Sequence, residues 1–220
     1  MALSRATKES IPKDAVIITE DEALAYQWNI ISKWEKLSDV WSLRYGPGIL
    51  SAMATGTGIF VNNHYRTKLR LGTYGRFSTY LPIVVIPAIF TLSCHKLFVQ
   101  RSVLLDPMGE CPTCVQLRAM AFQTAFGAIY PTILAPLSAC MFATRHFTYR
   151  LPSITENPKE VLQLIRKFTK PILPLLTSIL CIQGLTAIYL TYEEQKQNLV
   201  VLAKMKKFEQ EVEDNLAIGM

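Results

Sequence analysis

The chain has 220 residues, of which 50% are hydrophobic, and its formal net charge is +6. Soluble domains reach a similar apolar fraction, so composition alone does not exclude them. The clustering of the charges argues against a soluble domain. Charges collect between four apolar runs, near 45–63, 78–98, 119–143 and 170–190, whereas a soluble helical protein would spread them along one face of each helix. Five cysteines are too few for a fold built on disulfides. The pattern favours a polytopic membrane protein.

The N-terminal segment, residues 1–44, contains one predicted helix, from Thr19 to Trp41. Thr19 and Glu22 have the spacing of a capping box, which stabilises the start of a helix. All three tryptophans of the chain fall in this stretch, at Trp28, Trp34 and Trp41. Tryptophan favours the membrane–water interface, so the helix either lies in that interface or packs on a partner or on the bundle.

The first predicted span covers 45–63 and is the least apolar of the four. Gly48, Ala52 and Gly56 recur every four residues, and Ala54 and Gly58 form a second row. Small residues let helices approach closely in lipid, so Gly48, Ala52, Gly56 and Gly58 are predicted packing positions. A re-entrant hairpin or a buried segment is the alternative.

Residues 62–77 carry four cations and no acid. Cations beside a span set topology more often than they bind nucleic acid, and no nucleic-acid partner is predicted. The second span, 78–98, contains Pro82 and Pro87. Neighbouring helices make such prolines tolerable within a bilayer.

The segment from Val99 to Arg118 is predicted to be a loop that carries Cys111 and Cys114, and the third span, 119–143, follows it. Residues 144–170 hold six cations against two acids. A fourth span over 170–192 precedes a water-exposed tail, 193–220, with an apolar stripe at Val201, Met205, Phe208, Val212 and Leu216. This tail is predicted to be an amphipathic helix that can dock a partner.

Four spans place both termini and the 99–118 loop on one side, and the two basic loops on the other. Basic loops stay on the side from which insertion is directed. In a mitochondrial inner membrane, the termini and the cysteine pair would therefore face the intermembrane space.

The pair Cys111 and Cys114 is the only candidate for chemistry. A structural disulfide, a redox-active pair and half of a zinc site are three interpretations, and the last lacks a second ligand pair. Cys94 is either a third thiol for a relay or a small buried residue. The histidines, His64, His95 and His146, are scattered and are interpreted as interfacial. No acid lies inside any predicted span, which argues against an ion-coupled transporter.

Several short motifs resemble the transmembrane protein 126 family, in the same order over residues 45–190. They are the Gly58–Arg66 stretch, Leu97-Phe98-Val99 followed by Glu110-Cys111-Pro112-Thr113-Cys114, the Tyr130-Pro131 pair, and Ala143-Thr144-Arg145 followed by Leu151-Pro152. The positions that carry the resemblance are Asn62, Tyr65, Arg66, Tyr130, Pro131, Arg145 and Pro152.

The four apolar runs predict an all-α bundle of about four transmembrane helices, and the resemblance implies that this bundle lies in the mitochondrial inner membrane. The resemblance also implies a non-enzymatic assembly factor, without cofactor or metal, that binds membrane-arm subunits of respiratory complex I and other assembly factors. A membrane thiol–disulfide oxidoreductase that uses Cys111 and Cys114, and a permanent accessory subunit of complex I, are the alternatives.

Overall fold

The computed structural model describes residues 18–106, 109–150 and 158–218, and every regular element in these ranges is a helix. The α-helices are α1 (Glu20–Lys33), α2 (Trp41–Lys68), α3 (Arg76–Tyr80), α4 (Ile86–Cys94), α5 (Arg101–Leu105), α6 (Pro112–Thr124), α7 (Tyr130–His146), α8 (Pro158–Thr169) and α9 (Leu173–Ile218). Wider π-helical turns join some of them, at Leu81–Val85, His95–Gln100 and Ala125–Ile129.

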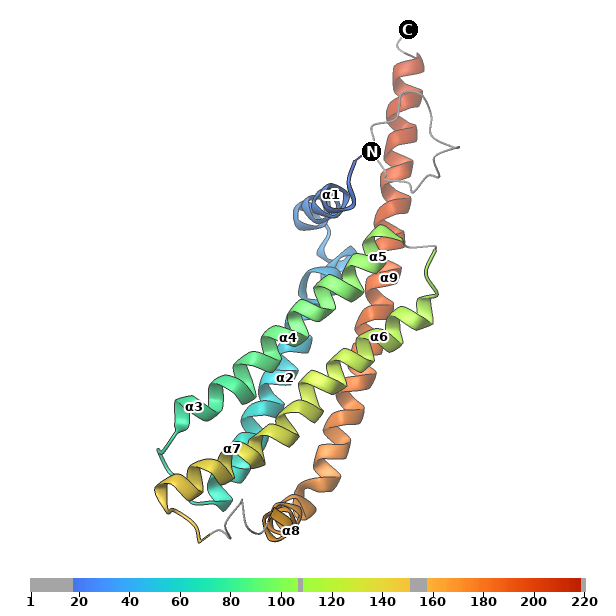
Figure 1. Cartoon of the computed structure of the whole chain (residues 1–220). Coiled ribbons are helices and arrows are strands. Elements are labelled where there is room, and N and C mark those ends of the chain that lie inside the picture. Colours follow the sequence, from blue (N-terminus) through green and yellow to red (C-terminus); the bar gives the residue numbers. More distant parts are fainter. Residues whose placement is uncertain (1–17, 107–108, 151–157, 219–220) are drawn as a thin grey trace.

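Four helical rods lie side by side and alternate in direction (Figure 1). They are α2, the run α3–α5, the run α6–α7, and α9. The ends of α2 and α7 lie at the bottom of Figure 1 with α8, whereas α1, α5, the start of α6 and the far end of α9 lie toward the top. The predicted all-α bundle is thus confirmed.

Three helical stretches are long and apolar enough to cross a membrane: Arg76–Leu105, Pro112–His146 and Lys159–Val212. Helix α2, the predicted first span, is 28 residues long but is not among them. It lies inside the bundle against α4, α7 and α9, so much of its surface meets protein. Such a helix needs less apolar surface than one that faces lipid on several sides.

The predicted helix from Thr19 to Trp41 is wrong in its extent. Its capping box forms as expected, but α1 ends at Lys33 and Trp41 begins α2. Arg44 donates to the carbonyls of Ile31 (2.6 Å) and Ser32 (2.8 Å), and so satisfies the end of α1. The chain can therefore turn a corner there, and the three tryptophans belong to different elements.

The predicted loop from Val99 to Arg118 is also wrong over most of its length. Residues up to Leu105 continue the second rod, and α6 already begins at Pro112. Proline suits the first position of a helix because its missing N–H would have no partner there. The connection between the rods is therefore only about six residues long, which keeps α5 close to α6.

Helix α9 joins the predicted fourth span and the predicted tail into one helix of 46 residues. No boundary forms at 192/193, because residues 190–198 are packed against the other helices instead of leaving the bundle. Leu190, Thr191, Glu194, Gln197 and Asn198 are all buried. Beyond them the helix projects past the other rods (Figure 1).

Candidate functional site

The most distinctive interior feature is a row of buried polar side chains on α9. Gln183, Glu194, Gln197 and Asn198 are each at most 5% exposed. Each one hydrogen-bonds to at least one of the other rods, and its partners are backbone groups or other buried side chains. Buried polar groups are costly unless they are paired, so this row fixes the position of α9 in the bundle.

Glu194 is the centre of this row. His95 Nε2 lies 3.0 Å and 3.1 Å from its two carboxylate oxygens, and Gln100 Nε2 donates to Oε1 at 2.7 Å. His95 and Gln100 begin and end one π-helical turn, whose wider spacing brings residues five apart to the same side. Helix α2 closes the cluster, since a Cβ on Gly46 would lie 2.8 Å from Glu194 Oε1.

Two further side chains of α9 satisfy helix ends. The first N–H groups of a helix and its last carbonyls have no partner inside the helix. Gln197 Oε1 accepts from the N–H groups of Ser42 (3.0 Å) and Leu43 (3.4 Å), in the first turn of α2. Asn198 Nδ2 donates to the carbonyl of Val103 (2.7 Å), near the end of α5. The row therefore joins three rods at one level.

A second polar layer lies deeper, between two apolar clusters. Gln123 Nε2 donates to Gln183 Oε1 (3.1 Å), and Gln183 Nε2 donates to Thr57 Oγ1 (2.6 Å) and to the Gly127 carbonyl (3.2 Å). The upper cluster includes Leu43, Leu50, Val99, Val115, Ala187 and Val201; the lower includes Val61, Tyr65, Ile83, Ala139 and Leu176. The amide layer links α2, α6–α7 and α9.

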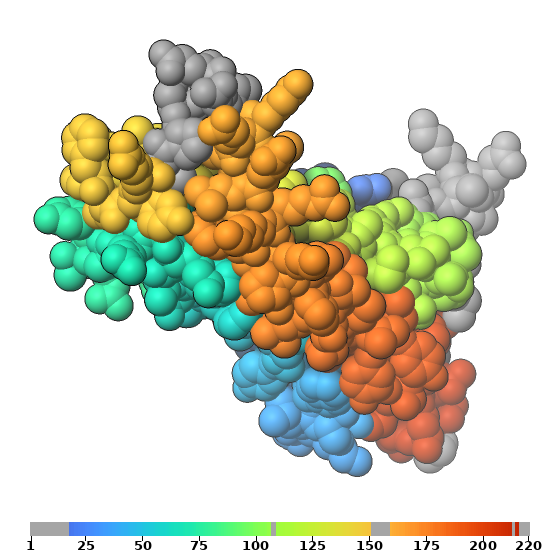
Figure 2. Space-filling model, turned by 90° about the horizontal axis from the view of Figure 1, so that it is seen from below, coloured from blue at the N-terminus to red at the C-terminus, as the bar shows by residue number. Residues whose placement is uncertain are grey.

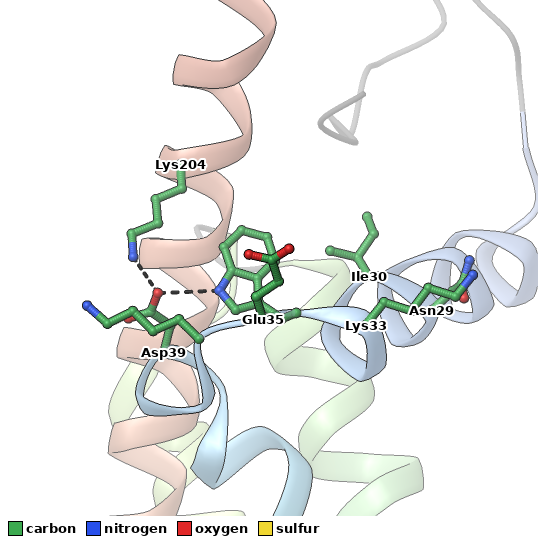
Figure 3. Close-up of a pocket in the computed structure, with 8 residues that line it drawn as sticks. Asn29, Ile30, Lys33, Glu35, Asp39 and Lys204 are labelled. Carbon is green, nitrogen blue, oxygen red and sulfur yellow. Dashed lines mark hydrogen bonds and ion pairs between the residues drawn. The ribbon is translucent and has the colours of Figure 1, made fainter.

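An open cavity of about 530 Å³ lies where α1 meets α9. Figure 3 shows Lys204 extending from α9 to Asp39. Trp34 Nε1 lies 3.3 Å from Asp39 Oδ2, and the Lys204 ammonium pairs with the same oxygen. The hydrogen bond from Lys204 lowers the pKa of Asp39 against the opposing effect of desolvation, and Trp34 lowers it further. These contacts tie the corner between α1 and α2 to α9.

The predicted cysteine pair lies at the start of α6. Cys111 is the N-cap of α6, Cys114 is one turn later, and both are free and exposed in this structure. The Cys114 thiol donates a hydrogen bond to the Cys111 sulfur, and this bond, together with the Cys114 and Thr113 N–H groups, lowers the pKa of Cys111. Among the described residues, no group of three His, Cys, Asp or Glu side chains could hold a metal.

The predicted relay through Cys94 does not form. Arg118 Nη1 donates to the Phe98 carbonyl (3.1 Å), which aligns these two points on neighbouring rods. Cys94 lies four residues below that level and Cys111 seven above it. At a rise of 1.5 Å per residue, the two thiols differ in level by about 16 Å.

The predicted packing row on α2 divides into two parts. Gly48, Ala52 and Gly56 are exposed, and a Cβ on either glycine would meet no atom within 4 Å. Gly58 faces the interior, where a Cβ would lie 2.6 Å from the Ile83 carbonyl oxygen. Within this chain, the π-helical turn Leu81–Val85 therefore approaches α2 at Gly58, and no such close approach occurs along the Gly48 row.

The family-motif positions gather mainly at the lower end of α2. Arg66 donates to Thr79 Oγ1 (2.9 Å) and to the carbonyls of Gly72 (2.8 Å) and Tyr74 (2.9 Å), which holds the α2–α3 turn. Asn62 Nδ2 donates to Thr79 Oγ1 (3.4 Å), and Tyr65 bonds to α8. Tyr130 and Pro131 begin α7, and Arg145 is exposed near its end. Pro152 lies outside the described residues.

Two residues of the cluster around Glu194 lie in surroundings that the sequence did not predict. His95 is buried, not interfacial, and Glu194 is a fully buried acid in the helix that continues the fourth span. The signal was present in the tail stripe. When the apolar stripe is extended from Val201 toward the N-terminus in steps of three and four residues, it passes through Asn198, Glu194 and Leu190. A helix with such a stripe presents these polar residues to its partners.

Comparisons with known proteins agree on one family. Residues 25–210 match the family described as transmembrane protein 126. A protein of Drosophila melanogaster named Transmembrane protein 126 is 60% identical over 214 residues, which cover 97% of this chain and 96% of that relative. No solved structure matches the chain.

Proposed function

The chain belongs to the transmembrane protein 126 family, and from this premise we propose that it is a non-enzymatic assembly factor for mitochondrial respiratory complex I. It binds intermediates of the membrane arm during biogenesis, together with other assembly factors, in the mitochondrial inner membrane. The family resemblance supports the choice of complex I. The structure supports the coarser part of the proposal, a helical membrane scaffold with surface left for partners.

The observation that carries the scaffold role is the apolar stripe on the projecting part of α9. Val201 is buried and Met205 packs partly against the upper cluster. Phe208 and Val212 continue the same stripe beyond the bundle, and they are 67% and 42% exposed. An amphipathic helix with unpartnered apolar residues at this spacing is suited to a groove or helix on another protein. We propose that this segment binds a membrane-arm subunit or a partner assembly factor.

The charge distribution supports one orientation in that membrane. The lower end carries the described cations of the two basic stretches, 64–77 and 144–170, which favours the matrix side. The termini and the Cys111–Cys114 turn then face the intermembrane space. Protease protection of tagged termini in intact mitoplasts measures this orientation, and protection of both termini contradicts it.

The test of function is a native-gel mass profile of digitonin-solubilised mitochondria with and without the protein. We expect the protein to migrate with partial membrane-arm assemblies, and its loss to stall complex I while other respiratory complexes mature. Co-migration with the finished enzyme alone supports the permanent-subunit alternative. Normal complex I without the protein overturns the proposal.

A thiol–disulfide oxidoreductase is the second candidate, and the lowered pKa of Cys111 favours it. The thiolate is the reactive form, and a helix N-terminus stabilises it. Replacing both cysteines by serine separates the two functions. A scaffold keeps its activity in the double variant when the protein accumulates normally, whereas an oxidoreductase loses all of it.

A further inference from the structure

The lower end of the bundle, as far as the structure describes it, is a surface of cations that form no salt bridge. Figure 2 views it from below, where the teal α2–α3 turn, the yellow end of α7 and the orange α8 meet. Its exposed cations are Lys68, Arg70, Arg76, Arg145, Arg150, Lys159, Arg166, Lys167 and Lys170. Between Leu69 and Leu173, the described acids are Asp106 and Glu110, which lie at the opposite end of the bundle, and Glu160, which lies at this end.

Helix α8 is held across this end by α2. His64 Nε2 lies 3.1 Å from the Phe168 carbonyl, and the Tyr65 hydroxyl lies 2.7 Å from Thr169 Oγ1. Figure 1 shows α8 almost end-on, whereas the rods run across the picture. Val161 is buried and Leu162 is 66% exposed. A basic amphipathic helix crossing the end of a bundle is placed to lie in the membrane interface.

Beside this contact, the outer face of α2 has a hollow of about 260 Å³. Its lining changes in polarity along the helix: Ile59 and Phe60 come first, then Asn63, His64 and Thr67, and finally Lys68. Ten residues of helix cover about 15 Å. The order of apolar, hydrogen-bonding and cationic groups matches the acyl chain, ester region and phosphate of a phospholipid.

Lys68 lines this hollow, and Lys167 and Lys170 flank Phe168 and Thr169, the α8 residues that contact α2. No carboxylate of the described chain pairs with Lys68, Lys167 or Lys170, and Lys170 directly follows Thr169, the residue that contacts Tyr65. Phe77 and Phe147, at the same end, are each 92% exposed. Exposed aromatic residues beside cations are typical of a membrane interface, and RNA phosphates would leave Ile59 and Phe60 without a partner.

We infer that the α2 hollow and the cations around it form a binding site for an anionic phospholipid, with the phosphate at Lys68, Lys167 and Lys170 and an acyl chain along Ile59 and Phe60. Each cation near an anionic lipid surface contributes about fivefold to binding. Bound lipid would also hold α8 against α2 at the membrane surface. This site is independent of the proposed role in complex I assembly.

The test uses the full chain purified in a neutral detergent, with equimolar phosphatidylglycerol and phosphatidylcholine added to the micelles. Native mass spectrometry counts the lipids that stay bound. We expect the wild-type protein to retain phosphatidylglycerol in preference to phosphatidylcholine. The triple variant Lys68→Gln, Lys167→Gln, Lys170→Gln should lose about a hundredfold in affinity for phosphatidylglycerol at low ionic strength, at about fivefold per cation, with unchanged phosphatidylcholine binding.

A matched control, Lys206→Gln with Lys207→Gln, removes two exposed cations from the projecting end of α9. It should leave the lipid preference intact. Asn63→Trp, which fills the hollow without removing charge, should reduce the number of tightly held lipids. If the triple variant loses helical content, Lys68→Gln is compared with Lys68→Arg, and only the first should weaken binding.

Three results overturn the inference. The first is that the triple variant keeps the wild-type preference for phosphatidylglycerol. The second is that the control at Lys206 and Lys207 loses as much affinity for phosphatidylglycerol as the triple variant. The third is that inorganic phosphate or a single-stranded oligoribonucleotide displaces the lipid at a concentration similar to that of phosphatidylglycerol itself. The last result would identify a general polyanion site in place of a phospholipid site.

Discussion

The side chain of Gln100 replaces a backbone hydrogen bond that Pro47 removes from α2. Its Nε2 donates to the Leu43 carbonyl at 2.9 Å, and this carbonyl would otherwise accept the N–H of residue 47. Gln183 serves the Gly127 carbonyl in the same way, at 3.2 Å, because Pro131 stands four residues later. Pro47 and Pro131 are thus each matched by an amide side chain from a neighbouring helix.

Replacing Gln100 by Leu should destabilise the bundle by about 2–4 kcal/mol, since the Leu43 carbonyl and Glu194 both lose a buried donor. In a Pro47→Ala background the cost should be smaller, because residue 47 then supplies the missing N–H. Thermal unfolding in detergent, followed by circular dichroism, measures both. Gln116→Leu, at a part-buried amide pair with Gln195, is the control and should cost less. Equal costs for Gln100→Leu in both backgrounds contradict the proline–amide relation.

Two glycines of α2 should respond oppositely to alanine. Gly58→Ala brings a Cβ within 2.6 Å of the Ile83 carbonyl oxygen, so the π-helical turn Leu81–Val85 must shift, at a cost of about 1–3 kcal/mol. Gly56→Ala meets open space and gains about 0.5–1 kcal/mol from helix propensity. Midpoints of thermal unfolding for the two variants test the sign. Destabilisation by Gly56→Ala would show that another molecule covers that face.

The Asp39–Lys204 pair should make stability depend on acid pH. The ordinary pKa of Asp39 is 3.8, and its contacts with Lys204 and Trp34 lower it in the folded protein. A depressed carboxyl pKa stabilises the fold above its unfolded value, and that contribution is lost as pH falls through the folded value. Wild type should lose more stability than Asp39→Asn between about pH 5 and pH 3. Parallel unfolding curves for the two proteins over this window contradict the prediction.

The reactivity of Cys111 should depend on Cys114. The hydrogen bond from the Cys114 thiol is the largest cause of the lowered Cys111 pKa, so Cys114→Ala should raise that pKa and slow alkylation of Cys111 by iodoacetamide at neutral pH. Peptide mass spectrometry over a time course gives the rate for this one site. Cys181→Ala, far along the chain on α9, should leave the rate unchanged. An unchanged rate in Cys114→Ala removes the physical basis of the redox candidate.

Charge on the projecting stripe of α9 should disrupt partner binding and leave the bundle intact. Phe208→Glu with Val212→Glu places carboxylates where the proposed partner buries apolar surface, so co-migration with membrane-arm assemblies should fall at least tenfold. Gln210→Glu with Asn215→Glu adds the same charge at other exposed positions of this segment and should be tolerated. Unfolding midpoints equal to wild type separate lost binding from lost folding. Retained co-migration of the first variant contradicts the docking role of the stripe.

Hydropathy and local signals determined much of the architecture. The apolar runs set the last three rods, Thr19 and Glu22 set the start of α1, and the alternation of spans put the basic turns at one end. These features depend on solvent preference and on contacts between residues a few positions apart, which a sequence displays directly. The stripe from Val201 to Val212 was likewise visible, although its continuation through Glu194 was not used.

Only the tertiary structure decided which surfaces meet. It placed Gly58, and not Gly48 or Gly56, at a helix contact, and it separated Cys94 from Cys111. It also brought His95, Gln100 and Glu194 together, although about a hundred residues separate the last from the first two. The rotation of each helix about its axis and the level at which rods align are set by packing between distant segments. For that reason, the burial of an acid such as Glu194 becomes favourable only when its partners arrive from other helices.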